Sequence, residues 1–128
     1  MKLLLDSHVV IWAVDETAKL STDAESLLQD LNNELVISAA IIWELSIKVG
    51  LAKLNLSLPY REWMQQAIAD LMAMVLPITV EYADVQAGLP HHHGDPFDRL
   101  LVAQAIVEKI PIVSNDTALD AYSVNRLW

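Results

Sequence analysis

The stretch Lys2-Leu-Leu-Leu5 is a short apolar run that ends at Asp6, and Ser7-His8 then opens a segment with helical character. Similar short apolar runs recur at 35–37, 74–78 and 112–113, and segments with helix caps separate them. Apolar strands that alternate with helices are typical of an α/β fold with a mostly parallel sheet. The high hydrophobic fraction, 54%, agrees with a sheet that is covered on both faces.

Turn and cap residues indicate where the individual elements begin and end. Thr22-Asp-Ala-Glu25 has the pattern of a capping box, Ser38 is placed to cap a helix that ends at Gly50, and Pro77 suggests an edge strand. The expected helices are 7–13, 22–31, 38–50, 59–72, 79–88 and 96–109, and the expected strands are 2–5, 35–37, 74–78, 112–113 and 123–127.

Composition limits the class of protein. A length of 128 residues predicts a single domain over residues 1–128. Seventeen acidic against eight basic residues give a net charge of −9, which argues against a protein that holds nucleic acid by its overall field. No apolar run approaches the ~20 residues that a membrane helix needs, the start is too short for a signal peptide, and cysteine is absent. We therefore expect a cytoplasmic protein without membrane attachment.

Four acidic residues stand at positions that this fold would bring together, namely Asp6, Glu44, Asp98 and Asp116. Asp6 and Asp116 follow apolar strands, and ligands of open parallel sheets bind at the carboxyl ends of the strands. Two carboxylates ~6 Å apart repel each other by about 3 kcal/mol at an effective dielectric constant of ~20. A group of four therefore needs protonation or a cation, and Mg²⁺ or Mn²⁺ suits oxygen ligands.

Each acid also has a simpler explanation. Asp6 could cap the helix that follows it, and Asp116 could belong to a turn. Glu44 could form an ion pair with Lys48 at the i+4 position. Asp95 is best explained as a cap, with Pro96 at the first helical position. The single residues leave these alternatives open, and only the set of four favours a metal site.

The tract His91-His-His93 invites a metal-binding interpretation, but three adjacent histidines cannot easily bind one ion, so a solvated loop is favoured. Arg99 could contact a phosphate or pair with an acid. Ser7 offers a hydroxyl beside Asp6. The four tryptophans are more typical of a core or an interface than of base stacking.

Four motifs in order along nearly the whole chain resemble the PIN-domain toxins of the VapC type. They are Leu5-Asp6-Ser7-His8 with Trp12, Ser38-x(4)-Trp43-Glu44-x(3)-Lys48, His93-Gly-Asp95-Pro-Phe-Asp98-Arg99, and Ser114-Asn-Asp116 followed by Tyr122, Val124 and Trp128. The family usually has threonine where Ser7 stands, and often where Ser114 stands, so the hydroxyl is kept at both positions.

This resemblance implies a three-layer α/β/α fold and a Mg²⁺- or Mn²⁺-dependent endoribonuclease. The residues that fall on the family's acidic quartet, and so would be catalytic and metal-binding, are Asp6, Glu44, Asp98 and Asp116. Ser7, Ser114, Arg99, His93 and Asp95 are possible substrate contacts or supporting residues. The resemblance further implies a cognate antitoxin as partner, an RNA substrate and a homodimer, with surplus apolar surface as a plausible interface.

The mechanism we expect is hydrolysis of RNA by a metal-activated water, with Asp6 and Asp116 as direct ligands and Asp98 sharing a metal. Glu44 could ligate or act as base through water. One alternative is a non-catalytic PIN-like module that only binds RNA or a partner. Another is a different phosphotransfer fold. A haloacid-type phosphatase, however, would need a second Asp where His8 stands, and a receiver domain would need paired acids there.

Overall fold

The computed structural model describes residues 1–128 and contains one five-stranded sheet in the order β3-β2-β1-β4-β5. The strands are β1 (Lys2–Leu5), β2 (Glu34–Ser38), β3 (Met74–Leu76), β4 (Ile112–Val113) and β5 (Arg126–Leu127). Every neighbouring pair is parallel, with Leu3 opposite Leu35 and Leu4 opposite both Val36 and Ile112. The expected parallel sheet is therefore confirmed.

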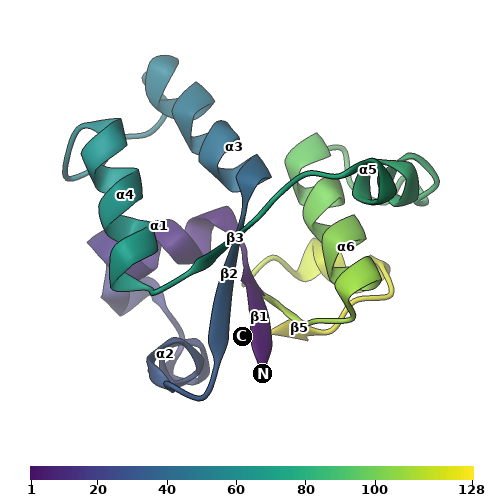
Figure 1. The fold of residues 1–128 in the computed structure, drawn as a ribbon, viewed down its shortest axis with the longest axis horizontal. Coiled ribbons are helices and arrows are strands. Elements are labelled where there is room, and N and C mark those ends of the chain that lie inside the picture. The colour runs from purple at the N-terminus through teal and green to yellow at the C-terminus, as the bar shows by residue number, and fades with distance from the viewer.

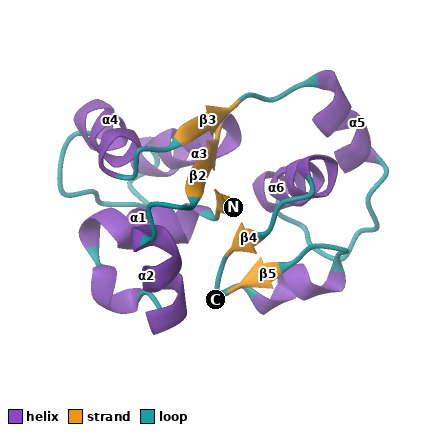
Figure 2. Ribbon diagram, turned by 60° about the horizontal axis from the view of Figure 1, so that its bottom comes forward, coloured by secondary structure: helices purple, strands orange, loops and turns teal.

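Helices cover both faces of this sheet. They are α1 (Ser7–Asp15), α2 (Thr22–Gln29), α3 (Ala39–Gly50), α4 (Tyr60–Asp70), α5 (Val80–Ala87) and α6 (Pro96–Glu108), with short 3₁₀ helices η1 (Thr17–Lys19) and η2 (Thr117–Ala121). The chain first moves outward from β1 to β3 and then returns to β4 on the other side of β1. Because crossovers between parallel strands are right-handed, the two directions place helices on opposite faces. Figures 1 and 2 show α1, α2 and α4 on one side and α5 and α6 on the other, which confirms the α/β/α layers.

The core lies around the central strand. Leu3, Leu4 and Leu5 are fully buried, as expected for a strand between two helical layers, and they belong to a cluster of 24 buried apolar residues. The helix α6 contributes Leu101 and Val102 to this cluster, in agreement with its apolar sequence. No helix of the structure is both long and apolar enough to cross a bilayer.

Several element boundaries agree with the sequence patterns, and one cap differs. Ser38 caps α3 by accepting a hydrogen bond from Ala40 N, and α3 ends at Gly50 as expected. The capping box assigned to Thr22 is wrong by one residue, because Ser21 Oγ accepts from Ala24 N at 3.0 Å and Thr22 is already helical. The helix also ends at Gln29, earlier than residue 31.

Candidate metal centre at the carboxyl edge of the sheet

The structure brings all four acids of the predicted quartet to one polar cavity of about 360 Å³. Asp6 follows β1, Glu44 lies in the second turn of α3, Asp98 lies in the first turn of α6, and Asp116 follows β4. In Figure 1, α3 and α6 stand on either side of the sheet above its carboxyl edge. No apolar residue lines the cavity, whose walls are formed by Asp6, Ser7, His8, Glu44, Lys48, Asp95, Asp98, Asn115, Asp116 and Thr117.

Asp6 is held by two serine hydroxyls. It is 4% exposed, and its side chain caps no helix, so the simpler explanation for this residue is not realised. Ser114 Oγ donates to Asp6 Oδ2 at 2.6 Å, and Ser7 Oγ lies 3.3 Å from Asp6 Oδ1. The short hydrogen bond from Ser114 fixes the orientation of the carboxylate. Asp6 is therefore a rigid oxygen donor at the bottom of the cavity.

Glu44 is as deeply buried as Asp6, at 2% exposure. The ion pair expected with Lys48 is present, with Lys48 Nζ donating to Glu44 Oε2 at 2.6 Å, and Ser7 Oγ lies 3.3 Å from the same oxygen. The second oxygen, Oε1, is buried without any hydrogen-bond partner. Buried carboxylate oxygens are rarely left unpaired, so this atom marks a place for an absent partner.

Asp95 and Asp98 have different roles at the start of α6, where Asp95 caps the helix and Asp98 lines the cavity. The side chain of Asp95 accepts from Phe97 N at 2.8 Å and from Asp98 N at 3.5 Å, which agrees with its interpretation as the cap. Asp98 is thereby free to face the cavity. Burial and then the negative charges of Asp6 and Asp95 raise the pKa of Asp98 to about 7, although His93 partly offsets this.

Asp116 serves both the turn and the cavity. Its Oδ1 accepts from Ala118 N at 3.0 Å and caps η2, so the turn interpretation holds for this oxygen. Its Oδ2 lies 3.3 Å from His93 Nε2. The backbone N–H of Asp116 donates to Ser114 Oγ, so one serine orients residues from the ends of two strands.

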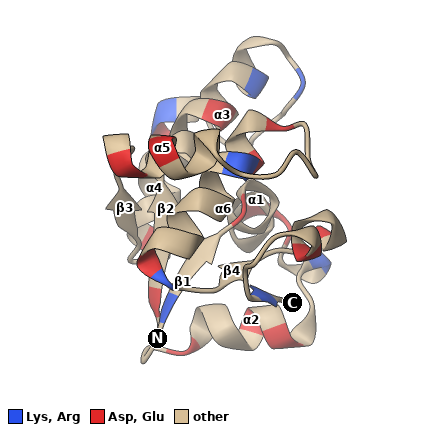
Figure 3. Ribbon diagram, turned by 90° about the vertical axis from the view of Figure 1, so that its right-hand side faces the viewer, with Lys and Arg blue, Asp and Glu red and all other residues tan.

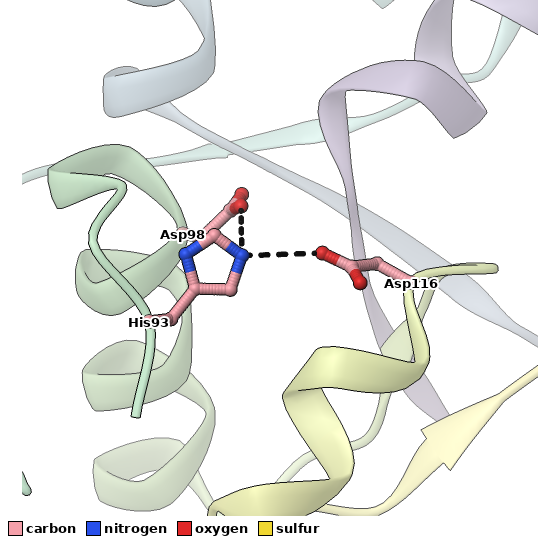
Figure 4. A group of neighbouring side chains, drawn as sticks. All are labelled: His93, Asp98 and Asp116. Carbon is pink, nitrogen blue, oxygen red and sulfur yellow. Dashed lines mark hydrogen bonds and ion pairs between the residues drawn. The ribbon is translucent and has the colours of Figure 1, made fainter. Parts of the chain in front are cut away.

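The expectation of a solvated histidine loop holds for His91 and His92, which are exposed, but not for His93. The His93 ring points between Asp98 and Asp116, and its Nε2 lies 3.3 Å from an oxygen of each (Figure 4). Their ligand atoms all lie within 4.8 Å of one another. The sequence feature that could have indicated this position is the short distance along the chain between His93 and Asp95, which places His93 next to the start of α6.

Arg99 contacts neither a phosphate site nor an acid, which differs from both expectations. It is 5% exposed, and its guanidinium donates to the carbonyl oxygens of Gln86, Leu89 and Pro90 and to the hydroxyl of Tyr122. These contacts require a loop that bends back over α6, and adjacency to Asp98 in the sequence does not reveal it. Arg99 therefore shapes the loop instead of lining the cavity.

Basic side chains do not gather around the cavity. Figure 3 shows lysine and arginine positions spread over separate elements, with no basic stripe on the face in view. Lys48 is the one lysine that lines the cavity, and it is already paired with Glu44. Burial opposes the charge of Lys48, but the hydrogen bond and the charge of Glu44 raise its pKa above the usual value. The cavity as a whole is thus suited to a cation.

Comparisons with known proteins agree with this architecture. Residues 3–125 match the PIN domain family. The chain is also similar to Ribonuclease VapC22 of Mycobacterium tuberculosis, at 33% identity over 121 residues that cover 94% of this chain and 91% of the relative.

Two solved structures have a similar fold. One is VapBC2 from Rickettsia felis bound to a DNA fragment from its promoter, with a TM-score of 0.71, 18% identity and coverage of 99% of this chain and 98% of the other. The other is FitAcB from Neisseria gonorrhoeae, with a TM-score of 0.72, 20% identity and coverage of 98% and 96%. At these identities the likeness concerns the fold alone.

Proposed function

Because this chain belongs to the PIN-domain family, we propose that it is a VapC-type endoribonuclease that depends on Mg²⁺ or Mn²⁺ and acts as the toxin of a toxin–antitoxin pair. The observation that carries the proposal is the meeting of four carboxylates from four separate elements in one polar cavity. A module that only binds a partner would not need such a costly arrangement of like charges.

The residues of the cavity fit a hard divalent cation. Carboxylate oxygens are the donors that Mg²⁺ and Mn²⁺ prefer. The buried Oε1 of Glu44 lacks a positive partner, and burial together with the nearby charges of Asp6 and Asp95 raises the pKa of Asp98. We propose that Asp6, Asp98 and Asp116 hold the metal, with Glu44 either completing the site or accepting a proton through water.

A cation in this site would lower the pKa of a water molecule and offset the charge that develops on the phosphodiester. The protein's own groups fix the geometry for that chemistry. Ser114 holds Asp6 through a 2.6 Å hydrogen bond, and Lys48 keeps one oxygen of Glu44 in place while the other faces no partner. Groups that are oriented before the substrate arrives need little reorganisation during the reaction.

We propose single-stranded RNA as the substrate class. The protein carries a net charge of −9, so its bulk field does not attract a polyanion, and the phosphate contact must come from the metal and a few local donors. Unstacked bases in loops and ends are the readable part of RNA. An open polar cavity at the sheet edge can accept such a strand.

The test is cleavage of a mixed-sequence structured RNA by the purified protein with Mg²⁺, with Mn²⁺ and with EDTA, beside an Asp98→Asn variant purified in the same way. We expect metal-dependent cutting that EDTA and the substitution both abolish. Cutting that survives EDTA would refute the metal-dependent mechanism. If no RNA is cut, induced expression in cells distinguishes a selective enzyme, which arrests growth unless Asp98 is replaced, from a binding module, which does not.

An antitoxin is the partner we propose. A solved structure of similar fold from Klebsiella pneumoniae is a toxin–antitoxin complex, and the negative net charge of this chain suits a basic partner segment. Co-expression with the protein encoded by the adjacent gene should yield a stable complex and restore growth. Persisting toxicity in the presence of a soluble neighbour protein would contradict this pairing.

We also propose a homodimer. An apolar cavity of about 420 Å³ lies between α3, α5 and α6, and Trp43 and Ile78 on its walls are 61% and 47% exposed. Exposed apolar surface of this kind is typical of an interface. Light scattering of the purified protein should give twice the monomer mass, and Trp43→Glu should give the monomer mass.

A further inference from the structure

His93 occupies the gap between the two outer carboxylates of the cavity, Asp98 and Asp116 (Figure 4). We propose that His93 donates a hydrogen bond to Asp116 beside Asp98 in the metal-free protein, that it competes with the cation for this pair of carboxylates, and that it is not a metal ligand. The inference rests on the metal site of the proposed function and adds a residue that sets how readily this site fills.

The hydrogen-bond network of the loop determines which ring nitrogen carries the proton. The backbone N–H of Asp95 donates to His93 Nδ1 at 3.1 Å, so the lone pair of Nδ1 is used as an acceptor. In a neutral imidazole the other nitrogen then bears the hydrogen. His93 Nε2 is therefore a donor, and two carboxylate oxygens lie beside it. Binding a metal through Nε2 would require the opposite tautomer and would leave the Asp95 N–H facing another hydrogen.

The His93 ring and a bound cation would contact the same two carboxylate oxygens, Asp98 Oδ2 and Asp116 Oδ2. Nε2 lies 3.3 Å from Asp98 Oδ2 and 3.3 Å from Asp116 Oδ2, and the three ligand atoms lie within 4.8 Å of one another. A cation bound by both carboxylates would thus take over the role of the Nε2 hydrogen. Charge-assisted N–H···O bonds are usually 2.7–2.9 Å long, so the 3.3 Å hydrogen bond between His93 Nε2 and Asp116 Oδ2 is weak enough for a metal to displace.

The position of the ring is fixed from outside the cavity by two positioning residues. The Tyr122 hydroxyl accepts from His93 N at 3.0 Å and from Arg99 Nη1 at 3.2 Å. Arg99 also donates to the carbonyl oxygens of Gln86, Leu89 and Pro90, so it fastens both ends of the turn that leads to the histidine tract. The competition between His93 and the cation therefore depends on Tyr122 and Arg99, which contact neither Asp98 nor Asp116 through their side chains.

Titration of the metal-free protein with Mn²⁺ alone, followed by electron paramagnetic resonance of the free ion, tests this without RNA. We expect His93→Ala to tighten Mn²⁺ binding by about fivefold, because a weak hydrogen bond with a net strength of about 1 kcal/mol no longer opposes the ion. His93→Gln restores an N–H near the Nε2 position and should return the affinity toward that of the natural protein. His91→Ala changes an exposed residue of the same loop and should leave it unchanged.

Tyr122→Phe provides a second variant that keeps His93 but removes its backbone anchor, and we expect a smaller tightening in the same direction. Weaker Mn²⁺ binding in His93→Ala would make His93 a ligand and overturn the inference, as would equal affinity in a folded variant. Absence of Mn²⁺ binding in every variant would refute the metal site itself. Binding by the natural protein with no change in His93→Ala would refute only the role of His93.

Discussion

The two halves of the acidic cavity are built differently. The inner pair, Asp6 and Glu44, is 4% and 2% exposed and is held by serine hydroxyls and Lys48 on the elements of the core. In the outer pair, Asp98 and Asp116, the side chains are 16% and 37% exposed and share a histidine from a loop. Contacts between core elements hold the inner pair in place. The outer pair contacts His93, whose position depends on the conformation of a loop.

The largest effect should come from breaking the inner half at Asp6. Asp6→Asn keeps the shape and the oxygen that accepts from Ser114 but removes the charge that a cation requires. We expect RNA cleavage to fall by more than about 100-fold, beyond the range typical of residues that only support a ligand. Circular dichroism should show an intact fold. Retained cleavage, or retained toxicity in cells, would contradict the role of Asp6.

A smaller loss should follow from removing the support of the same residue. Ser114→Ala deletes the 2.6 Å hydrogen bond to Asp6 and leaves the carboxylate charged. We expect metal-dependent cleavage or Mn²⁺ affinity to fall by roughly 10-fold, as for other partners that orient a ligand. Ser46→Ala, which removes a hydroxyl bound only to a backbone carbonyl of α3, serves as the matched control and should change neither quantity. Equal effects of the two variants would remove the distinction between a supported and an unsupported carboxylate.

The outer half should make the stability of the metal-free protein depend on pH through Asp98. The pKa of Asp98 is about 7 in the folded protein, against ~3.9 for an unfolded Asp. Between these values the folded state holds a proton that the unfolded state has lost, so the stability of the metal-free protein falls as the pH rises through this window. Asp98→Asn removes this penalty and should raise the melting temperature by a few degrees at pH 8, with no difference near pH 4.

The exposed Asp84 of α5 offers the control for this measurement, since Asp84→Asn also removes one negative charge but outside the cavity. Its melting temperature should follow that of the natural protein at both pH values. A similar rise in both variants at pH 8 would assign the effect to net charge instead of the cavity. Saturating Mg²⁺ should reduce the advantage of Asp98→Asn, because the cation offsets the same repulsion in the natural protein.

The sequence predicted the four carboxylates of the cavity better than the histidine that lies between two of them, and the reason is geometric. The carboxyl ends of parallel strands share one edge, so the positions of Asp6 and Asp116 follow from recognising β1 and β4. The orientation of His93 depends instead on Tyr122, which is 29 residues away in the chain. Local patterns contain no information about such a contact.

The same distinction explains the errors in local structure. Ser21 and Thr22 are adjacent hydroxyl residues, and either can cap a helix, so the pattern alone left the start of α2 uncertain by one residue. Arg99 was expected near a phosphate or an acid because Asp98 precedes it. Successive helical residues point in different directions, and the side chain of Arg99 lies under the 86–90 segment.

The hydrogen bond between Ser114 and Asp6 joins residues 108 positions apart, and this separation has a consequence for synthesis of the protein. At a translation rate of about 5–20 residues per second, roughly 5 to 20 s pass between the addition of Asp6 and the addition of Asp116. During that time the growing chain has no complete acidic quartet. On the proposed function, a ribosome making this nuclease is therefore shielded from its own nascent product until Asp116 has been added.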